Sequence, residues 1–490
     1  LCIYYIKAYD PHKAREYGEK ALATAKELGE DAYARSVQGN LDIVYYRLGD
    51  RDNFEEAFRK RAKESIEAGN YPRAATELSN LAAIYHLEGN YAKAAPIFKE
   101  SAELSEKARE ELIPVESRLK FMETQTSSYY GMIICLAELG KTEELFQAME
   151  NSRGRVMSEH LGLEKSLDAL SLADAQKLPK PDEALLMYGV TGDGKVAICV
   201  ITNSSVKSFN VDQQELFDNL HKSYKPYFDS QRSGGFNPFR STGSAAFSDM
   251  TQLLREVMQD PKGATELAAH RDKILDAYYK LLIQPVLSSV SGKKNLIVCP
   301  DGYLSFIPFE ALKSSSGRYV IEDFGVRYVP SAKVMKLIQN RSYAAERKNV
   351  LAFGGANYAP YQYSVSPVQD DIAYFKLVDQ VDKSFQHNGS QRNNYAKIGV
   401  MGKSWKFLQG TLAEVAQIES TVSGVEAYYG DDFTEEKIKS FSANGKLDDY
   451  RAVHLATHGM AVPTIPQLST VIMTLFEEEK NGEDGYLTAR

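Results

Sequence analysis

The first third of the chain repeats one helical pattern. Gly29, Gly49, Gly69 and Gly89 are spaced 20 residues apart, and each follows a run whose apolar positions recur every three or four residues. Glycine is favoured just past the end of a helix, because it adopts the left-handed backbone conformation without a steric penalty. Residues 1 to about 165 are therefore predicted to form amphipathic helices joined by similar turns. A fixed spacing favours a solenoid over a generic helical bundle.

Two of these glycines are followed by the same short motif. Residues 70–74 and 90–94 both read Asn-Tyr-x-x-Ala. The positions that fit the tetratricopeptide template are Leu81, Ala82, Tyr85, Gly89, Tyr91, Ala94 and Phe98. Two helices per unit give a period of about 40 residues, longer than the usual ~34. Such arrays present a concave surface to protein partners. Arg153 and Arg155, near the end of the array, are expected to lie on a solvated or ion-pairing face.

From about residue 180 the apolar pattern changes to period two. The predicted strands of this half are residues 184–190, 195–202, 205–211 and 295–299. Helical patterns cover residues 213–227 and residues 249 to about 287, separated by a segment rich in Ser and Gly. Pro300-Asp301-Gly302 is a turn signal, so Asp301 is expected to form a turn rather than to act in catalysis.

A second α/β pattern begins at residue 348. Strands are predicted at residues 348–354, 426–429 and 453–456, and helices at residues 411–422 and 434–443. Alternating strands and helices imply a mainly parallel sheet. Thr411 and Glu414 fit a capping box. Residues 468–476 are expected to form the next strand and residues 485–490 the approach to a helix. The long polar segment 356–406, rich in Tyr, is interpreted as a substrate- or partner-facing insertion or as disordered chain.

His458 is the strongest candidate for chemistry. It follows an apolar strand and precedes Gly459, so it is expected at the carboxyl end of a strand, where open α/β sheets bind ligands. A histidine exchanges protons near neutral pH. The backbone N–H of Gly459 is unshielded and can stabilise an oxyanion. The alternative is a buried or capping histidine without a catalytic role.

Five segments match one family in order: residues 150–161, 283–312, 324–332, 408–415 and the Ala-Thr-His-Gly of residues 456–459. With these motifs the chain resembles the CHAT family, caspase-like cysteine peptidases joined to tetratricopeptide repeats. The resemblance implies a helical TPR-like solenoid over residues 1–165, followed by an α/β caspase-like (CHAT) domain. Residues 166–345 would be its inactive half, and residues 346–490 its catalytic half, incomplete at the C-terminus.

The resemblance also implies a function. The intact protein would be a cysteine endopeptidase that cleaves a protein target and is regulated by a protein bound to the repeats, in bacterial defence or signalling. His458 would be the catalytic histidine, with Gly459 contributing to the oxyanion hole. In the family the nucleophilic cysteine lies on the strand after the histidine, which here places it beyond Arg490. We therefore expect a chain that is a fragment at both ends and catalytically inert by itself.

The cysteines of the chain do not fit the role of nucleophile. Cys2, Cys135, Cys199 and Cys299 are scattered without metal-type spacing, as in proteins of a reducing compartment, and we expect a cytoplasmic location. Cys199 and Cys299 lie in apolar runs, where a thiol stays protonated. All four precede His458, the reverse of the caspase-like order.

Composition excludes several other functions. The net charge of −8, without a basic block, argues against direct nucleic-acid binding, and no apolar run is long enough for a membrane span. No cofactor or metal is expected: on a strand, His454 and His458 lie about 13 Å apart, too far for one zinc ion. The oligomeric state is left open. The remaining alternative to a peptidase is a non-catalytic TPR scaffold with a degenerate caspase-like domain.

Overall fold

The computed structural model describes residues 10–49, 54–110, 115–160, 170–192, 194–232, 245–259, 270–358, 394–395, 405–460, 462, 468–476 and 483–488. Contacts divide the chain into two compact units. The first unit contains Leu1–Asp218 and Thr251–Asn340, and the second contains Asn219–Met250 and Arg341–Arg490.

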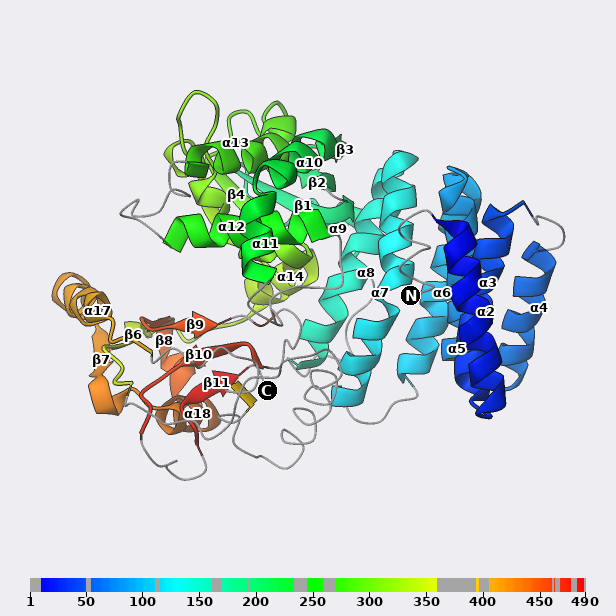
Figure 1. Cartoon of the computed structure of the whole chain (residues 1–490). Helices are drawn as coiled ribbons and strands as arrows, with labels where there is room; N and C mark the ends of the chain where they lie inside the picture. The colour runs from blue at the N-terminus through cyan, green and yellow to red at the C-terminus, as the bar shows by residue number, and fades with distance from the viewer. Residues whose placement is uncertain are drawn as a thin grey trace. The chain divides into compact units, whose positions relative to one another are not determined.

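The first unit begins with an array of helices, most of which pack against the next helix in sequence (Figure 1). They are α2 (Pro11–Glu27), α3 (Asp31–Arg47), α4 (Phe54–Glu67), α5 (Tyr71–Leu87), α6 (Tyr91–Glu110), α7 (Val115–Glu138) and α8 (Thr142–His160). Gly29, Gly49, Gly69 and Gly89 follow four of these helices with φ of 70°, 104°, 70° and 71°. The prediction that these glycines end helices is therefore confirmed, because this region of φ strains other residues.

Close packing and buried ion pairs hold the array together. A Cβ atom on Gly131 of α7 would lie 2.4 Å from the ring of Phe98, so only glycine allows α6 and α7 to approach this closely. Arg61 of α4 lies 2.8 Å from Asp42 of α3 and 2.8 Å from Glu77 of α5. One guanidinium thus links three consecutive helices.

The sheet of the first unit has the strand order β3-β2-β1-β4-β5. Its strands are β1 (Glu183–Gly192), β2 (Lys195–Ile201), β3 (Val206–Asp212), β4 (Asn295–Cys299) and β5 (Gly325–Tyr328). β1, β2 and β3 pair in antiparallel fashion, whereas β4 pairs in parallel with β1 and β5. The carboxyl ends of β1, β4 and β5 therefore share one edge of the sheet.

The helices between residues 170 and 340 differ in part from the prediction. They are α9 (Leu172–Ala175), α10 (Gln214–Ser223), α11 (Lys225–Arg232), α12 (Ala245–Gln259), α13 (Arg271–Leu282) and α14 (Ala332–Asn340). The predicted helix over residues 213–227 is two helices that break at Tyr224, and α12 begins four residues before the predicted start. Residues 260–269, which the second helical pattern includes, lie outside the described residues.

Helix α8 joins the array to this sheet. The carboxylate of Glu150 accepts hydrogen bonds from the backbone N–H groups of Ala332 (3.0 Å) and Lys333 (2.8 Å), at the start of α14. The Arg153 guanidinium donates to the carbonyl oxygens of Tyr188 and Cys299 and lies 3.6 Å from Asp301. Of the two expected alternatives, the ion pair is therefore confirmed for Arg153, whereas the solvated face is wrong because the side chain is largely buried. The side chain of Arg155 lies outside the described residues.

The turn after β4 is part of the same arrangement. Asp301 accepts a hydrogen bond of 2.9 Å from the backbone N–H of Val190, at the end of the neighbouring β1. Asp301 is therefore a structural turn residue, as predicted.

Helices α7 and α8 pack directly against the backbone of β1. A Cβ atom on Gly189 would lie 2.9 Å from Ile133 and 3.0 Å from Met149.

The second unit contains a parallel sheet of order β7-β6-β8. Its strands are β6 (Lys348–Gly354), β7 (Val425–Tyr429) and β8 (Tyr450–Leu455), and its helices are α17 (Gln409–Thr421) and α18 (Glu435–Ala443). Phe353 packs with Phe433 and Ile438 on the α18 side. Ala352, the preceding strand residue, packs with Val415 of α17. Because successive strand residues point to opposite faces, the two helices cover opposite sides of the sheet.

The predicted capping box of α17 is wrong. The helix begins two residues earlier, with Leu408 as its N-cap and no side-chain capping bond. The Thr411 hydroxyl donates to the Leu408 carbonyl (2.7 Å) and accepts from the N–H of Gly355 (3.1 Å), at the end of β6. Glu414 lies 3.0 Å from His454 of β8 instead of reaching back to the helix start. Both side chains fix α17 to the sheet.

A small antiparallel sheet of order β11-β10-β9 follows β8. Its strands are β9 (Gly459–Met460), β10 (Thr470–Ile472) and β11 (Tyr486–Thr488). Residues 468–476, predicted to form the next strand, contain β10, which is shorter than predicted and antiparallel, because the chain reverses and β10 pairs with the residues just after His458. Residues 486–488 form a strand rather than the approach to a helix. Most of the predicted insertion 356–406 lies outside the described residues.

Replacement of Gly354 by Ala is expected to destabilise the second unit by about 1–3 kcal/mol through overpacking. A Cβ atom there would lie 2.6 Å from both the Thr411 carbonyl oxygen and the Val415 side chain. Gly410→Ala is the matched control, because a Cβ atom there meets nothing within 4 Å, and alanine favours a helix. Urea denaturation compares the two variants; equal midpoints would contradict the packing of α17 on β6.

Glu426 of β7 accepts hydrogen bonds from four side chains, two of which belong to the neighbouring strands β6 and β8. Its carboxylate accepts from Lys348 (2.7 Å), Lys446 (2.5 Å), Tyr428 (2.6 Å) and Tyr450. These hydrogen bonds, with those from Lys348 and Lys446 as the largest, hold the pKa of Glu426 far below its usual 4.5. The folded state therefore favours the ionised carboxylate. The resulting stability is present above pH 4.5 and is lost as the pH falls toward the folded-state pKa.

Replacement of Glu426 by Gln is expected to lower the free energy of unfolding at pH 7 by about 1 kcal/mol or more, because hydrogen bonds to a charged group are lost. The difference from the natural protein shrinks as the pH falls below 4.5, because the Glu426 carboxylate of the unfolded chain then takes up a proton while that of the folded state stays ionised. Urea denaturation at pH 7 and at successively lower pH measures this difference in the free energy of unfolding. A difference independent of pH would contradict the role of the charge.

Candidate active site

His458 lies just past the carboxyl end of β8. The parallel ladder between β6 and β8 continues to a hydrogen bond of 2.8 Å from the N–H of Ala456 to the Phe353 carbonyl. Three residues after Ala456 the chain enters β9 of the antiparallel sheet. His458 therefore occupies the link between the two sheets, at the edge where the sequence places it.

The orientation of the His458 ring is set by a main-chain group. Its Nε2 atom lies 2.8 Å from the carbonyl oxygen of Lys406. A carbonyl oxygen only accepts hydrogen bonds, so Nε2 carries the proton in the neutral ring. Nδ1 then has the free lone pair. This tautomer makes Nδ1 the atom that can take a proton from a neighbouring group.

Two aromatic side chains flank the imidazole. The ring of Tyr358 lies 5.1 Å from that of His458, and the ring of Trp405 lies 5.0 Å from it. Trp405 also donates its indole N–H to the hydroxyl of Tyr486 at 3.3 Å. The His458 ring is thus held between rings that are themselves anchored.

Backbone and hydroxyl contacts fix the residues next to His458. Thr457 donates its hydroxyl hydrogen to the Ile472 carbonyl of β10. The Tyr358 hydroxyl, 2.5 Å from the Thr457 oxygen, must therefore donate to Thr457. Burial raises the pKa of Tyr358, which keeps this phenol protonated. The N–H of Ile472 donates to the His458 carbonyl at 2.9 Å, so β10 binds both Thr457 and the main chain of His458.

The N–H of Gly459 is free of the sheet ladder. His458 and Ile472 face each other as a hydrogen-bonded pair, and the next pair along is Gly459 and Val471. In an antiparallel ladder hydrogen-bonded and non-hydrogen-bonded pairs alternate, so the Gly459 N–H points away from β10. Among the described residues, a Cβ atom on Gly459 would meet only the Thr470 carbonyl oxygen, at 4.0 Å.

The structure gives the two neighbouring histidines different partners. His454 lies 3.0 Å from Glu414, whereas His458 contacts the Lys406 carbonyl. Within the described ranges, no three His, Cys, Asp or Glu side chains converge as a metal site would require.

The described thiols are unsuited to nucleophilic attack. Cys135, Cys199 and Cys299 are free and buried. Burial raises the pKa of Cys135 and Cys199 to about 12 and that of Cys299 to about 11, the last despite the nearby Arg153 guanidinium. The thiolate is the reactive form, so the prediction of inert thiols is confirmed for these three. Cys2 lies outside the described residues.

One edge of the His458 strand is unpaired within the part of the chain that the structure describes. β8 pairs with β6 on one side, and no described strand pairs with its other side. Ala452 and Val453 are exposed, and Val453 retains 43% of its accessible surface. A further strand on this edge would lie about 5 Å from β8. A side chain ending that strand would come within reach of His458.

Sequence reasoning missed three contacts of this site. Tyr358 belongs to the Tyr-rich start of the segment 356–406, and this composition was only a weak indication that Tyr358 contacts the site. Trp405 is the only tryptophan of the chain, a stronger signal that was not used. The contact with Lys406 involves its carbonyl oxygen, and every residue has one, so no sequence signal could have found it.

Comparison with known proteins shows that part of the chain matches a protein family. Residues 272–490 match the model of the CHAT domain, a fold related to caspase-like peptidases. The match includes β4 to β11 and His458, and the helical array lies outside it. No curated protein matches the chain. The similarity to the CHAT domain family is therefore shown for residues 272–490.

Proposed function

We propose that the intact protein is a caspase-like cysteine endopeptidase that cleaves a protein target. The observation that carries this proposal is the state of His458. Its Nε2–H is bound by the Lys406 carbonyl, which leaves Nδ1 as the proton acceptor, and no described strand pairs with the second edge of β8. A histidine with one nitrogen bound by an acceptor and the other free is oriented for general base catalysis.

The nucleophile would be a cysteine on a strand that follows the printed sequence and pairs with the open edge of β8. Nδ1 of His458 takes the thiol proton, and the sulfur attacks the scissile carbonyl carbon. The imidazolium then protonates the leaving amine, and water hydrolyses the thioester. The N–H of Gly459, with that of the cysteine, would stabilise the oxyanion, an effect of about 3 kcal/mol per donor in other enzymes.

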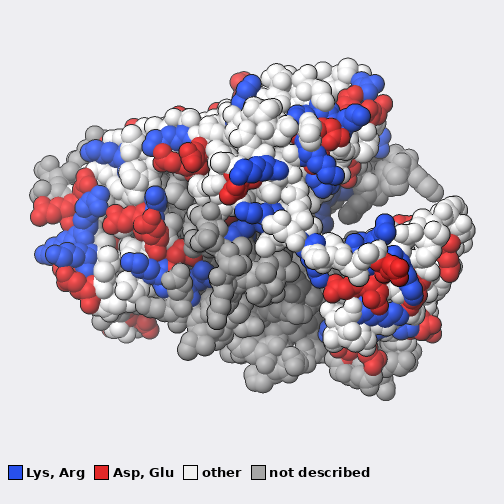
Figure 2. All heavy atoms as spheres, turned by 180° about the vertical axis from the view of Figure 1, so that it is seen from behind, with Lys and Arg blue, Asp and Glu red and all other residues white. Residues whose placement is uncertain are grey.

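The helical array would bind a regulatory protein. The TPR-like motif of residues 70–74 and 90–94 supports this role. A role in bacterial defence or signalling rests on the family resemblance. Acidic and basic side chains alternate on the described surface in Figure 2, which favours a protein partner over a nucleic acid. Among the described residues, no helix has the length and apolar character of a membrane crossing.

The test is covalent labelling of the natural protein with a peptidyl electrophile that reacts with active-site thiolates, followed by peptide mapping. The expected result is one labelled cysteine beyond Arg490, with labelling lost in His458→Ala. Labelling of Cys135, Cys199 or Cys299 would contradict the proposal. So would labelling that does not depend on His458.

A non-catalytic scaffold is the second candidate. It is favoured by the burial and raised pKa of Cys135, Cys199 and Cys299, which leave no reactive thiol among the described residues. In this case the domain would bind proteins through the array and cleave nothing. Absence of labelling in the natural protein, together with binding of a partner by residues 1–165, would establish the scaffold.

A further inference from the structure

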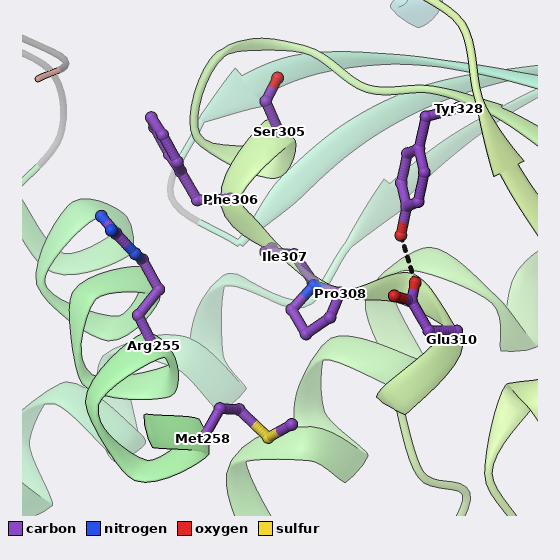
Figure 3. A pocket seen from close by; sticks show the side chains of 8 residues that line it. All are labelled: Arg255, Met258, Ser305, Phe306, Ile307, Pro308, Glu310 and Tyr328. Carbon is purple, nitrogen blue, oxygen red and sulfur yellow. Dashed lines mark hydrogen bonds between the residues drawn. The ribbon is translucent and has the colours of Figure 1, made fainter. Parts of the chain in front are cut away.

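A pocket of about 400 Å³ lies in the first unit, at the carboxyl ends of β4 and β5. Its lining comes from α12, from the short helices Gly302–Phe306 and Phe309–Ala311 that follow β4, and from the last residue of β5. The lining residues are Arg255, Met258, Ser305, Phe306, Ile307, Pro308, Glu310 and Tyr328 (Figure 3). The edge formed by the carboxyl ends of parallel strands is where α/β folds bind ligands.

Arg255 is the cationic group of this pocket. Its guanidinium lies 5.1 Å from the centre of the Phe306 ring. In the described part of the chain no carboxylate pairs with it, and burial lowers its pKa. Stacking on an aromatic ring holds a guanidinium while leaving its in-plane N–H groups free. A half-buried cation without a counterion is costly, and an anionic ligand would remove that cost.

The opposite side of the pocket offers an acceptor. Tyr328 donates its hydroxyl hydrogen to one carboxylate oxygen of Glu310 and accepts a hydrogen bond of 2.9 Å from the N–H of Phe309. The second oxygen of Glu310 keeps its capacity to accept. Figure 3 shows Arg255 and the Tyr328–Glu310 pair on opposite sides, with Ile307 and Pro308 between them.

The surface between the two charged groups is apolar. Met258, Ile307 and Pro308 line it. An apolar ligand group of a few carbon atoms would contact these side chains. A volume of about 400 Å³ lies at the small end of the range for ligand pockets, which suits a ligand the size of a dipeptide.

We propose that this pocket binds a ligand of dipeptide size in which a carboxylate, an apolar side chain and an N–H donor follow one another. The carboxylate would bind Arg255, the apolar group would contact Met258, Ile307 and Pro308, and the N–H would donate to Glu310. The carboxyl terminus of a peptide has this chemistry, and so does a free N-acylated dipeptide. This site is additional to the proposed peptidase function and does not depend on it.

The test is isothermal titration calorimetry, in which N-acetyl-Leu-Leu is titrated into the 490-residue chain. The expected result is saturable binding with a Kd in the range of about 0.1–1 mM, which suits a ligand of this size. The C-terminal amide of the same dipeptide removes the carboxylate and is expected to bind at least about tenfold more weakly, since one charge-assisted pair is lost.

Variants locate the site. Arg255→Gln is expected to weaken binding of the acid at least about tenfold and to leave binding of the amide unchanged. Phe306→Leu, which removes the stacking surface for the guanidinium, is expected to weaken binding of the acid by a smaller factor. Arg318→Gln is the matched control, because Arg318 is exposed in the same unit, pairs with Asp323 and does not line the pocket. It is expected to bind the acid with unchanged affinity.

Three results would overturn the proposal: equal affinity for acid and amide, unchanged affinity in Arg255→Gln, or no saturable binding of the acid up to about 10 mM. An eight-residue peptide ending in Leu-Leu separates the two sources of the ligand. Tighter binding of this peptide than of the dipeptide supports the carboxyl terminus of a protein. Equal or weaker binding supports a free N-acylated dipeptide.

Discussion

Replacement of His458 by Ala in the intact protein is expected to lower kcat/KM for peptide cleavage by about a thousand-fold or more. The variant removes both the base that activates the thiol and the acid that protonates the leaving amine. The fold is expected to survive, because the His458 main chain, held by β10 through Ile472, is retained. Cleavage of a fluorogenic peptide at several pH values measures the effect.

Two further variants distinguish catalysis from structure. His454→Ala is the matched control, since His454 lies on β8, four residues before His458, and its described partner is Glu414 of α17. Its kcat/KM is expected to stay within about threefold of the natural value. Tyr358→Phe keeps the ring beside His458 but removes the hydrogen bond to Thr457. It is expected to lower kcat about tenfold with little change in KM, because the variant loses one of the hydrogen bonds that position the histidine. Equal losses in His454→Ala and His458→Ala would contradict the assignment.

Replacement of Arg153 by Ala is expected to destabilise the first unit by about 3–5 kcal/mol, the usual cost of breaking a buried ion pair. The Arg153 side chain is only 11% exposed, and its loss leaves the Asp301 carboxylate and the carbonyls of Tyr188 and Cys299 without this donor. Chemical denaturation followed by circular dichroism measures the midpoint of the transition of this unit.

Matched variants separate the charge of Arg153 from its bulk. Arg153→Met keeps most of the apolar volume and is expected to recover only part of the loss, because the polar partners stay unsatisfied. Arg59→Gln disturbs an exposed ion pair of α4 and is expected to change stability by less than about 1 kcal/mol. A loss in Arg153→Ala no larger than that in Arg59→Gln would show that α8 is not fixed to the sheet through this residue.

Local patterns were sufficient to predict most strands. The predictions for β4 and β6 match the structure at both ends, and those for β1 to β3 differ by one or two residues. Period-two apolar runs and the turn residues around them are local features of the sequence. The start of α17 was predicted wrongly because the hydroxyl of Thr411 binds Gly355, 56 residues away, rather than the beginning of its own helix. A competing partner so distant leaves no trace in a four-residue motif.

In the candidate site, too, a local pattern predicted one residue but not its partners that are distant in sequence. His458 was found from the strand before it and the glycine after it. Its partners come from the two ends of the segment 356–406: Tyr358 near the start, and Trp405 with Lys406 at the finish. The sequence suggested that this segment was functional or disordered but gave no indication that its ends meet at the histidine. Contacts across about 50 residues depend on tertiary packing, which periodicity does not encode.

The position of α8 limits how this protein can be rebuilt by recombination. Glu150 and Arg153 belong to the array in sequence but complete the hydrogen bonding of α14, β1 and β4, and Met149 packs on Gly189. If the crossover is placed after His160, a helix from another protein replaces α8, and the sheet loses the side chains that it requires. Functional chimaeras that exchange one array for another therefore have to cross over before α7, so that the last two helices are inherited together with the sheet.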